Sequence, residues 1–190
     1  GCVLKVKFIT NTTLIETITD RFREKFGSSP RCMVRAPGRI NLLGEHVDYN
    51  DGYVMPAAID RATYLVFSAA DGNASTILAE DLHQEINISS QSVESKTQVN
   101  GLAMPDWGLY PAGVNRILAD QGYSVNALNG VFASDVPIGA GLSSSASVEV
   151  AFLNAWLKLG DISLSKMEQA RLCQQAENAY VGVNCGIMDQ

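Results

Sequence analysis

The stretch Val136-Pro-Ile-Gly-Ala-Gly-Leu-Ser-Ser-Ser-Ala146 decides the fold of this chain, because it joins a predicted strand to a predicted helix. The strand covers residues 128–133. The helix covers residues 145–159 and is apolar nearly all round, which is typical of a buried helix. A glycine turn that opens a helix directs unpaired backbone N–H groups at one point, where the helix dipole adds positive charge. The stretch therefore indicates a phosphate site. Alternatively, it is a glycine turn with Ser143 as the helix N-cap.

Outward from this stretch, predicted strands and helices alternate along the chain. Strands are predicted over residues 33–43, 57–69, 76–79 and 85–88, and helices over residues 13–26, 107–120 and 165–180. Residues 3–9 are a half-buried strand or a leader, Asn50-Asp-Gly52 is a hairpin-type turn, and the polar residues 89–101 are a surface loop. With no linker or repeat between these elements, the sequence predicts one α+β domain.

Composition and charge exclude several classes of function. The chain has 190 residues, is 46% apolar and 18% charged, and carries a net charge of −6. This acidic balance argues against a nucleic-acid or membrane partner, and no apolar run is long enough to span a bilayer. The four cysteines, Cys2, Cys32, Cys173 and Cys185, lack metal-binding spacing, and Cys173 falls on an apolar helical stripe as a buried thiol. These features predict a cytoplasmic protein.

Glu177 is the first candidate for chemistry outside the glycine turn. The helix over residues 165–180 begins with a capping box, and Glu177 lies on the same face as Cys173 and Tyr180. A buried carboxylate is costly unless it meets a cation or several donors. Glu177 and Ser145 could therefore hold Mg²⁺ together. Alternatively, Glu177 reaches the edge of the helix and is solvated.

Two further clusters are polar and bounded by glycines. Residues 36–52 bring one arginine, one histidine and three carboxylates close together, as a polyhydroxylated ligand requires; alternatively, they form a solvated turn. The last loop, Gly182-Val-Asn-Cys-Gly-Ile-Met-Asp-Gln190, contains Asp189, which on its own would be a cap or turn residue.

Together the three clusters resemble, in order and spacing, the galactokinase branch of the GHMP small-molecule kinases. Pro37-Gly-Arg-Ile-Asn-Leu-Leu-Gly-Glu-His-Val-Asp-Tyr49 resembles the sugar signature of that branch, with Val47 where threonine is common. Pro137-Ile-Gly-Ala-Gly-Leu-Ser-Ser-Ser-Ala146 resembles the ATP loop of the superfamily. Gln175-Ala-Glu-Asn178, followed by Cys185-Gly-Ile-Met-Asp-Gln190, resembles the metal-and-catalysis segment.

The resemblance implies a role for each matching residue. Asp189 would accept the proton of the anomeric hydroxyl, and Arg39 would stabilise the transition state. Ser145 and Glu177 would bind Mg²⁺. The sugar-binding positions would be Glu45, His46, Val47, Asp48 and Gly186, and the triphosphate loop would comprise Gly139, Ala140, Gly141, Leu142, Ser143, Ser144 and Ser145.

The resemblance also implies a fold and an activity. The fold would be the α+β N-terminal domain of GHMP kinases, which resembles the second domain of ribosomal protein S5: a mixed sheet with helices packed on one face. Residues 1–190 would form this single domain, with residues 1–12 as a leader or edge strand and without the family's C-terminal domain. The activity would be ATP-dependent phosphorylation of galactose to galactose 1-phosphate. The alternatives are N-acetylgalactosamine or another sugar as acceptor, or a non-catalytic fragment that binds sugar or nucleotide.

Overall fold

A five-stranded mixed sheet forms the centre of the structure, a computed structural model that describes residues 10–44 and 53–190. The strands are β1 (Cys32–Leu43), β2 (Met55–Ala69), β3 (Ser75–Ala79), β4 (Gln84–Ile88) and β5 (Leu128–Ser134). Their order in the sheet is β1-β2-β5-β3-β4. The β3–β5 pair is parallel, whereas the other pairs are antiparallel. The predicted mixed sheet and α+β class are confirmed.

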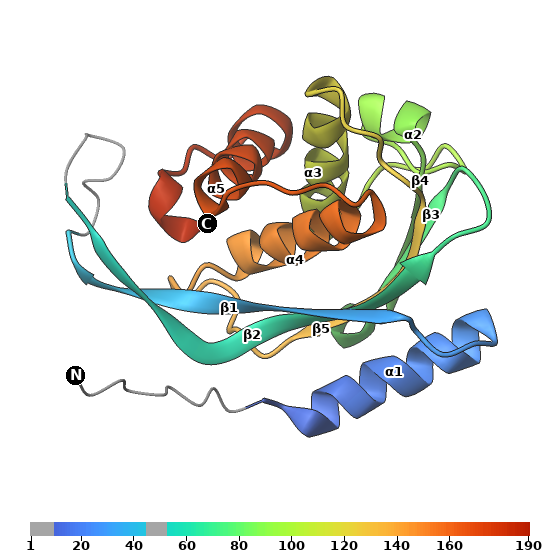
Figure 1. Ribbon diagram of the computed structural model, residues 1–190, viewed down its shortest axis with the longest axis horizontal. Coiled ribbons are helices and arrows are strands. Elements are labelled where there is room, and N and C mark those ends of the chain that lie inside the picture. Colours follow the sequence, from blue (N-terminus) through green and yellow to red (C-terminus); the bar gives the residue numbers. More distant parts are fainter. Residues whose placement is uncertain (1–9, 45–52) are drawn as a thin grey trace.

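Side chains alternate between the two faces of the sheet along each strand, and apolar side chains lie on both faces. On β2, Leu65 and Phe67 enter one core, whereas Tyr64 and Val66 enter a second core on the opposite face. The helices are α1 (Thr12–Phe26), α2 (Ser90–Glu94), α3 (Leu109–Asp120), α4 (Ser144–Leu159) and α5 (Lys166–Gln175). Helices α2–α5 cover the first face, as predicted, while among the described residues α1 is the helix that covers the second (Figure 1).

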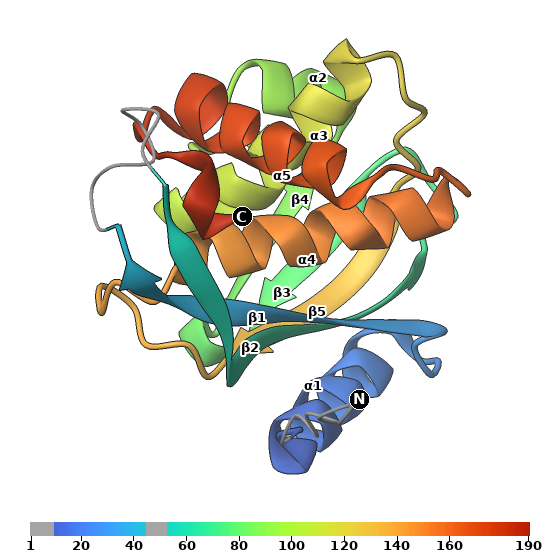
Figure 2. The same ribbon diagram turned by 60° about the vertical axis from the view of Figure 1, so that its left-hand side comes forward.

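Helix α4 is the centre of the larger core and confirms the predicted buried helix. It lies between the sheet and the outer helices α3 and α5 (Figure 2). Phe152 is fully buried and Trp156 nearly so, and their rings lie 5.7 Å apart. Because α4 is packed on all sides, its N-terminus is held in a fixed position relative to β1 and α5.

Two predicted elements differ in the structure. Residues 89–101 are not simply a loop, because α2 forms at Ser90–Glu94. The side chains of Ser89 and Ser92 each accept a hydrogen bond from the other's backbone N–H, and Val93 is buried, so local capping and one apolar contact stabilise the helix. Residue 12 is not part of a leader or edge strand, since it begins α1, which Asn11 caps through a hydrogen bond from the Leu14 N–H.

The helix predicted over residues 165–180 begins as expected but changes form. The capping box of Ser165 and Glu168 is present, and α5 runs to Gln175. The next six residues, Ala176–Val181 (η4), form a π-helix, in which the Gly182 N–H donates to the Glu177 carbonyl at 2.9 Å. Such π-turns occur often at functional sites. The predicted strand at residues 3–9 and the turn at residues 50–52 lie outside the described residues.

The remaining short elements are 3₁₀ turns. They are η2 (Glu80–Leu82), η3 (Asp106–Gly108) and η5 (Ile187–Asp189). Turn η3 leads directly into α3, so the helix predicted over residues 107–120 starts with one tighter turn. None of the helices in residues 10–44 and 53–190 has the length and apolar composition that a bilayer span requires.

Candidate functional site

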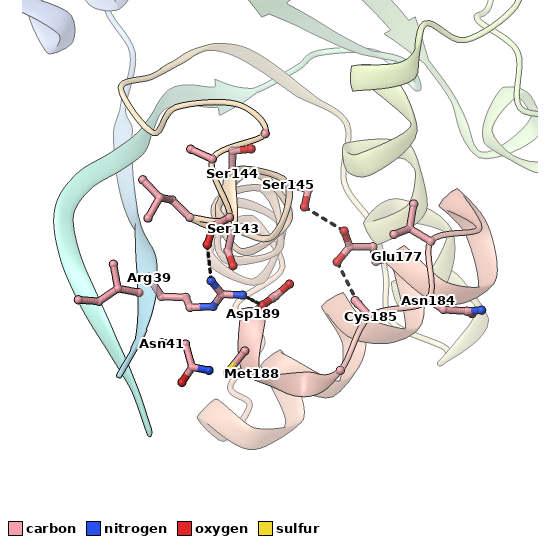
Figure 3. Close-up of a pocket in the computed structure, with 17 residues that line it drawn as sticks. Arg39, Asn41, Ser143, Ser144, Ser145, Glu177, Asn184, Cys185, Met188 and Asp189 are labelled. Carbon is pink, nitrogen blue, oxygen red and sulfur yellow. Dashed lines mark hydrogen bonds and ion pairs between the residues drawn. The ribbon is translucent and has the colours of Figure 1, made fainter. Parts of the chain in front are cut away.

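A pocket of about 710 Å³ lies where β1, the N-terminus of α4 and the segment after the π-helix meet (Figure 3). These three elements come from distant parts of the chain, and each carries one of the clusters recognised in the sequence. The lining residues are Arg39, Ile40, Asn41, Gly139, Ala140, Gly141, Leu142, Ser143, Ser144, Ser145, Glu177, Val183, Asn184, Cys185, Gly186, Met188 and Asp189.

The glycine turn opens α4 in the manner that anion sites require. Gly139 and Gly141 have φ values of +73° and +68°, in the left-handed region that glycine adopts without strain. Ser143 occupies the N-cap position with φ of +56°, but its side chain makes no capping hydrogen bond. Ser143 is therefore the N-cap residue, as predicted, but it does not cap α4 through its side chain. The first N–H groups of α4 thus have no capping side chain, and Ser144 and Ser145, which begin the helix, line the pocket.

Arg39 connects the three segments that form the pocket. Its backbone N–H donates to the Leu142 carbonyl at 3.2 Å, which joins β1 to the glycine turn. Its guanidinium donates through Nη1 to the Gly141 carbonyl at 2.7 Å and through Nη2 to Asp189. The two charged side chains are mostly shielded, with 16% of Arg39 and 26% of Asp189 exposed. A shielded ion pair of this kind fixes both groups at the pocket wall.

Glu177 lies at the opposite wall and is only 3% exposed. Its side chain is therefore not solvated at a helix edge, and the alternative of a solvated carboxylate is wrong. The Ser145 Oγ donates to its Oε1 at 2.9 Å. Cys185 Sγ and Gln190 Nε2 donate to its Oε2, at 3.1 and 2.8 Å. No lysine or arginine within the described residues forms an ion pair with this buried carboxylate.

The pair of Ser145 and Glu177 has the chemistry of a partial Mg²⁺ site. Both side chains offer oxygen atoms, and a buried carboxylate without a cationic partner is stabilised by a divalent ion. In the described part of the chain, no group of three His, Cys, Asp or Glu side chains could hold a metal. An ion here would therefore take its other ligands from water and from a bound phosphate, as Mg²⁺ commonly does.

Glu149, which lies one helical turn after Ser145, was not predicted as a site residue. It is fully buried, and neither carboxylate oxygen has a hydrogen-bond partner. Burial, and then the charge of Glu177, raise the pKa of Glu149 to about 9. Gln190 lies near enough to oppose this shift slightly, but its amide nitrogen donates to Glu177 instead. An acidic residue inside a helix predicted to be buried all round was the signal that could have identified it.

A second, apolar groove of about 320 Å³ adjoins the first pocket and was not predicted. The two share Ser144 and Ser145 at the N-terminus of α4. Its walls are largely aromatic and aliphatic and include Trp107, Tyr110, Phe132, Val136, Ile138 and Val148. A ligand with a charged end in the first pocket could therefore place a flat apolar group in the second.

The structure brings most of the predicted site residues together. Arg39, the loop at residues 139–145, Glu177, Gly186 and Asp189 all line the first pocket. Glu45, His46, Val47 and Asp48 lie outside the described residues. The described ends of β1 and β2, at Leu43 and Met55, flank the segment that contains these four positions.

Two family models match the parts of the chain that line the pocket. Residues 20–69 match the galactokinase galactose-binding signature, and residues 111–190 match the N-terminal domain of GHMP kinases. The chain is 43% identical to a galactokinase of Roseiflexus sp. (strain RS-1) over 173 residues, which cover 91% of the chain and 42% of that relative. It is 40% identical to a galactokinase of Streptomyces coelicolor over 177 residues, which cover 92% of the chain and 44% of the relative. The chain thus spans less than half the length of these curated relatives.

Solved structures agree with this assignment. The galactokinase of Lactococcus lactis in complex with galactose matches with a TM-score of 0.81 and 32% identity, over 92% of this chain and 45% of that chain. A mevalonate kinase matches with a TM-score of 0.67 and 18% identity, over 83% of this chain and 49% of that chain. The second likeness shows the shared fold alone.

Proposed function

The chain belongs to the galactokinase branch of the GHMP kinases, and from this premise we propose that it forms the N-terminal half of an ATP-dependent galactose 1-kinase. The pocket that joins Arg39, Ser145, Glu177 and Asp189 is the observation that carries the proposal. Residues 1–190 would act as a single domain of this enzyme. The described cysteines are free thiols, which agrees with a reducing, cytoplasmic setting.

ATP would lie across the two adjoining pockets. Its triphosphate would meet Gly139, Ala140, Gly141, Leu142, Ser143, Ser144 and Ser145, where backbone N–H groups and the N-terminus of α4 favour negative charge. Its purine would enter the apolar groove between Trp107 and Val136, which begins at Ser144. A helix terminus beside an apolar groove thus matches both ends of the nucleotide.

Mg²⁺ would be held by the Ser145 hydroxyl and the Glu177 carboxylate, together with phosphate oxygens. When bound, the ion offsets the charge of the β- and γ-phosphates. Ser145 also lies in the first turn of α4, so one residue would contribute to both phosphate and cation binding.

Asp189 would orient the anomeric hydroxyl of galactose and take its proton. The hydroxyl oxygen forms a bond to the γ-phosphorus, the bond from that phosphorus to the bridging oxygen of ADP breaks, and the proton passes to the Asp189 carboxylate. The Arg39 guanidinium already contacts Asp189, so it would stabilise the carboxylate before transfer and the phosphoryl charge during transfer. Gly186 in the pocket, with Glu45, His46, Val47 and Asp48, would bind the sugar.

The test is a coupled ADP-release assay with ATP, Mg²⁺ and a panel of sugars. We expect galactose to be phosphorylated at the anomeric oxygen, which ³¹P NMR identifies, and Asp189→Ala to lower kcat by about 10²–10⁴-fold with little change in ATP affinity. Turnover of N-acetylgalactosamine in preference to galactose would support the alternative acceptor.

A non-catalytic fragment is the remaining alternative, and binding measurements separate it from the kinase. Calorimetry with Mg²⁺·ATP and with galactose, combined with the ADP-release assay, gives three outcomes. Binding of both ligands without turnover indicates a binding fragment, binding of neither indicates an inert one, and turnover that Asp189→Ala leaves intact contradicts the role given to Asp189.

A further inference from the structure

The two carboxylate oxygens of Glu177 have different surroundings. Oε1 accepts the hydrogen bond from Ser145 Oγ at 2.9 Å. Oε2 accepts hydrogen bonds from Cys185 Sγ at 3.1 Å and Gln190 Nε2 at 2.8 Å, both from the segment after the π-helix. Figure 3 shows the two sides: Ser145 approaches one oxygen from α4, and Cys185 approaches the other from the C-terminal segment. Oε2 is therefore already committed to protein donors.

Cys185 is fixed in place by its own backbone. Its N–H donates to Asn178 Oδ1 at 2.9 Å, and its carbonyl accepts from Asn178 Nδ2 and Gln174 Nε2, both at 3.3 Å. The thiol has one proton and two acceptors within reach, Glu177 Oε2 and Asn178 Oδ1, the latter at 3.3 Å. Since Asn178 Oδ1 already accepts the backbone N–H and a carboxylate is the stronger acceptor, the thiol proton goes to Glu177.

Gln190 anchors the other end of the same segment. Its Nε2 also lies 3.6 Å from Cys185 Sγ, so Glu177, Cys185 and Gln190 form one connected group. Between Cys185 and Gln190 lies the turn η5, which carries Asp189. The turn with Asp189 is therefore attached at both ends to a single oxygen of Glu177.

We infer that Cys185 and Gln190 are positioning residues that make Glu177 a one-oxygen ligand of the cation and tie the Asp189 turn to the cation site. By holding Oε2, they leave Oε1 and the Ser145 hydroxyl as the only protein oxygens of this group that face the ion. The inference rests on the proposed function for the identity of the ion and of the phosphoryl-transfer turn. Hydrogen bonds to a ligating carboxylate commonly contribute 10–100-fold to metal affinity.

Mn²⁺ binding in the presence of ATP, followed by electron paramagnetic resonance, tests the first part. We expect Cys185→Ala to weaken Mn²⁺ binding about 10-fold or more, and Cys185→Ser, which keeps a donor, to recover most of that loss. Cys32→Ala removes a partly buried thiol at the first residue of β1 and should leave Mn²⁺ binding unchanged. Equal affinities for Cys185→Ala and Cys32→Ala would overturn the inference, provided that urea unfolding shows both variants folded.

Infrared difference spectra on adding Mg²⁺ and ATP give a readout that a purely structural role would not move. The separation of the two carboxylate stretching bands distinguishes one-oxygen from two-oxygen ligation, and Glu177→Gln identifies the bands of Glu177 by their loss. We expect one-oxygen ligation in the parent protein and a shift toward two-oxygen ligation in Cys185→Ala. Two-oxygen ligation in the parent protein, or spectra that Cys185→Ala does not change, would contradict the inference.

Gln190→Ala tests the link to Asp189. We expect kcat to fall about 10-fold, because the turn with Asp189 loses its second anchor. The KM for ATP should rise by a smaller factor. An unchanged kcat would contradict the inferred link between Gln190 and the turn with Asp189. The cation measurements need no sugar, so a failure to phosphorylate galactose would defeat the proposed function while the Mn²⁺ and infrared results still decide the inference.

Discussion

Gly38 on β1 lies directly against the carbonyl of Leu142 in the glycine turn. A β-carbon at Gly38 would lie 2.7 Å from that oxygen and 3.1 Å from Val136 Cγ1. The backbones of β1 and the glycine turn can therefore approach closely only because residue 38 has no side chain. The next residue, Arg39, makes the backbone hydrogen bond to Leu142. The close approach of Gly38 to Leu142 therefore places the Arg39 side chain near the start of α4.

Gly38→Ala is expected to push the glycine turn away from β1. The added methyl group meets a backbone atom rather than a flexible side chain, so we expect a loss of about 1–3 kcal/mol in the free energy of unfolding and ATP binding weakened about 10-fold or more. Calorimetry with Mg²⁺·ATP and urea unfolding measure the two effects. Gly72→Ala is the control, since a β-carbon there meets nothing within 4 Å. Identical behaviour of the two variants would show that the close approach is unimportant.

Arg39→Lys is expected to impair turnover although it keeps the charge. Arg39 donates to Gly141 and to Asp189 from two different nitrogens, and a lysine has a single nitrogen that cannot reproduce this geometry. We expect kcat to fall about 10²-fold with a small change in stability. Arg35→Lys, on the same strand but hydrogen-bonded to Asp60, should keep nearly full activity. Steady-state kinetics of both variants measure the effect. Equal activity of Arg39→Lys and Arg35→Lys would contradict the role given to the two nitrogen donors of Arg39.

Glu149→Gln is expected to stabilise the protein at high pH. The pKa of Glu149 is raised from 4.5 to about 9 in the folded protein, mainly by burial. The folded state therefore keeps a proton that the unfolded state releases above about pH 4.5, so folding free energy becomes less favourable as pH rises from there to about 9. A glutamine does not titrate, and we expect it to add about 2–4 kcal/mol at pH 8 and almost nothing near pH 4.

Urea unfolding of Glu149→Gln and the parent protein across pH 4–9 measures this difference. The exposed Glu16→Gln on α1 is the control and should follow the parent curve at every pH. A stability gain that does not grow with pH would mean that Glu149 is ionised in the folded protein.

Trp107→Leu is expected to weaken the binding of ATP but not that of inorganic tripolyphosphate. Trp107 lines the apolar groove, whereas the phosphate loop lies in the adjoining pocket, so only a ligand with a base should lose contact area. We expect the Kd for ATP to rise about 10-fold, the size of effect seen when one stacking partner of a base is removed. Tripolyphosphate, titrated separately into the same variant, serves as the control. An equal loss for both ligands would place the base outside this groove.

Lys96→Met is expected to loosen the π-helix that carries Glu177. Lys96 Nζ donates to the Tyr180 carbonyl at 2.6 Å and lies 5.0 Å from the centre of the Tyr180 ring. Losing this charge-assisted bond should cost about 1–3 kcal/mol in the free energy of unfolding. Lys158→Met, at the exposed end of α4, is the control and should cost less than about 0.5 kcal/mol. Urea unfolding compares the two, and equal losses would show that the Tyr180 carbonyl does not depend on Lys96.

Local patterns were enough to predict most of the fold. Strand alternation located β2, β3, β4 and β5 to within two residues, and the nearly all-round apolar composition of α4 predicted that this helix is largely buried. The predictions failed where a single capping pair or tertiary packing decides the outcome. Helix α2 depends on one reciprocal pair of serine caps, and the π-helix depends on how residues 176–181 pack against α3, which periodicity does not encode.

The sequence alone determined which side chains are available for chemistry and which elements carry them. The glycines of the turn, the serine at the start of α4, the apolar stripe beneath Glu177 and the arginine on β1 are all local features, because each follows from residue type and spacing. The tertiary structure alone decided that these side chains meet. The Arg39–Asp189 and Ser145–Glu177 contacts join residues 150 and 32 positions apart, and the burial that raises the pKa of Glu149 exists only when α4 is enclosed. Such contacts depend on the packing of the whole sheet and its helices, which no local stretch of the chain contains.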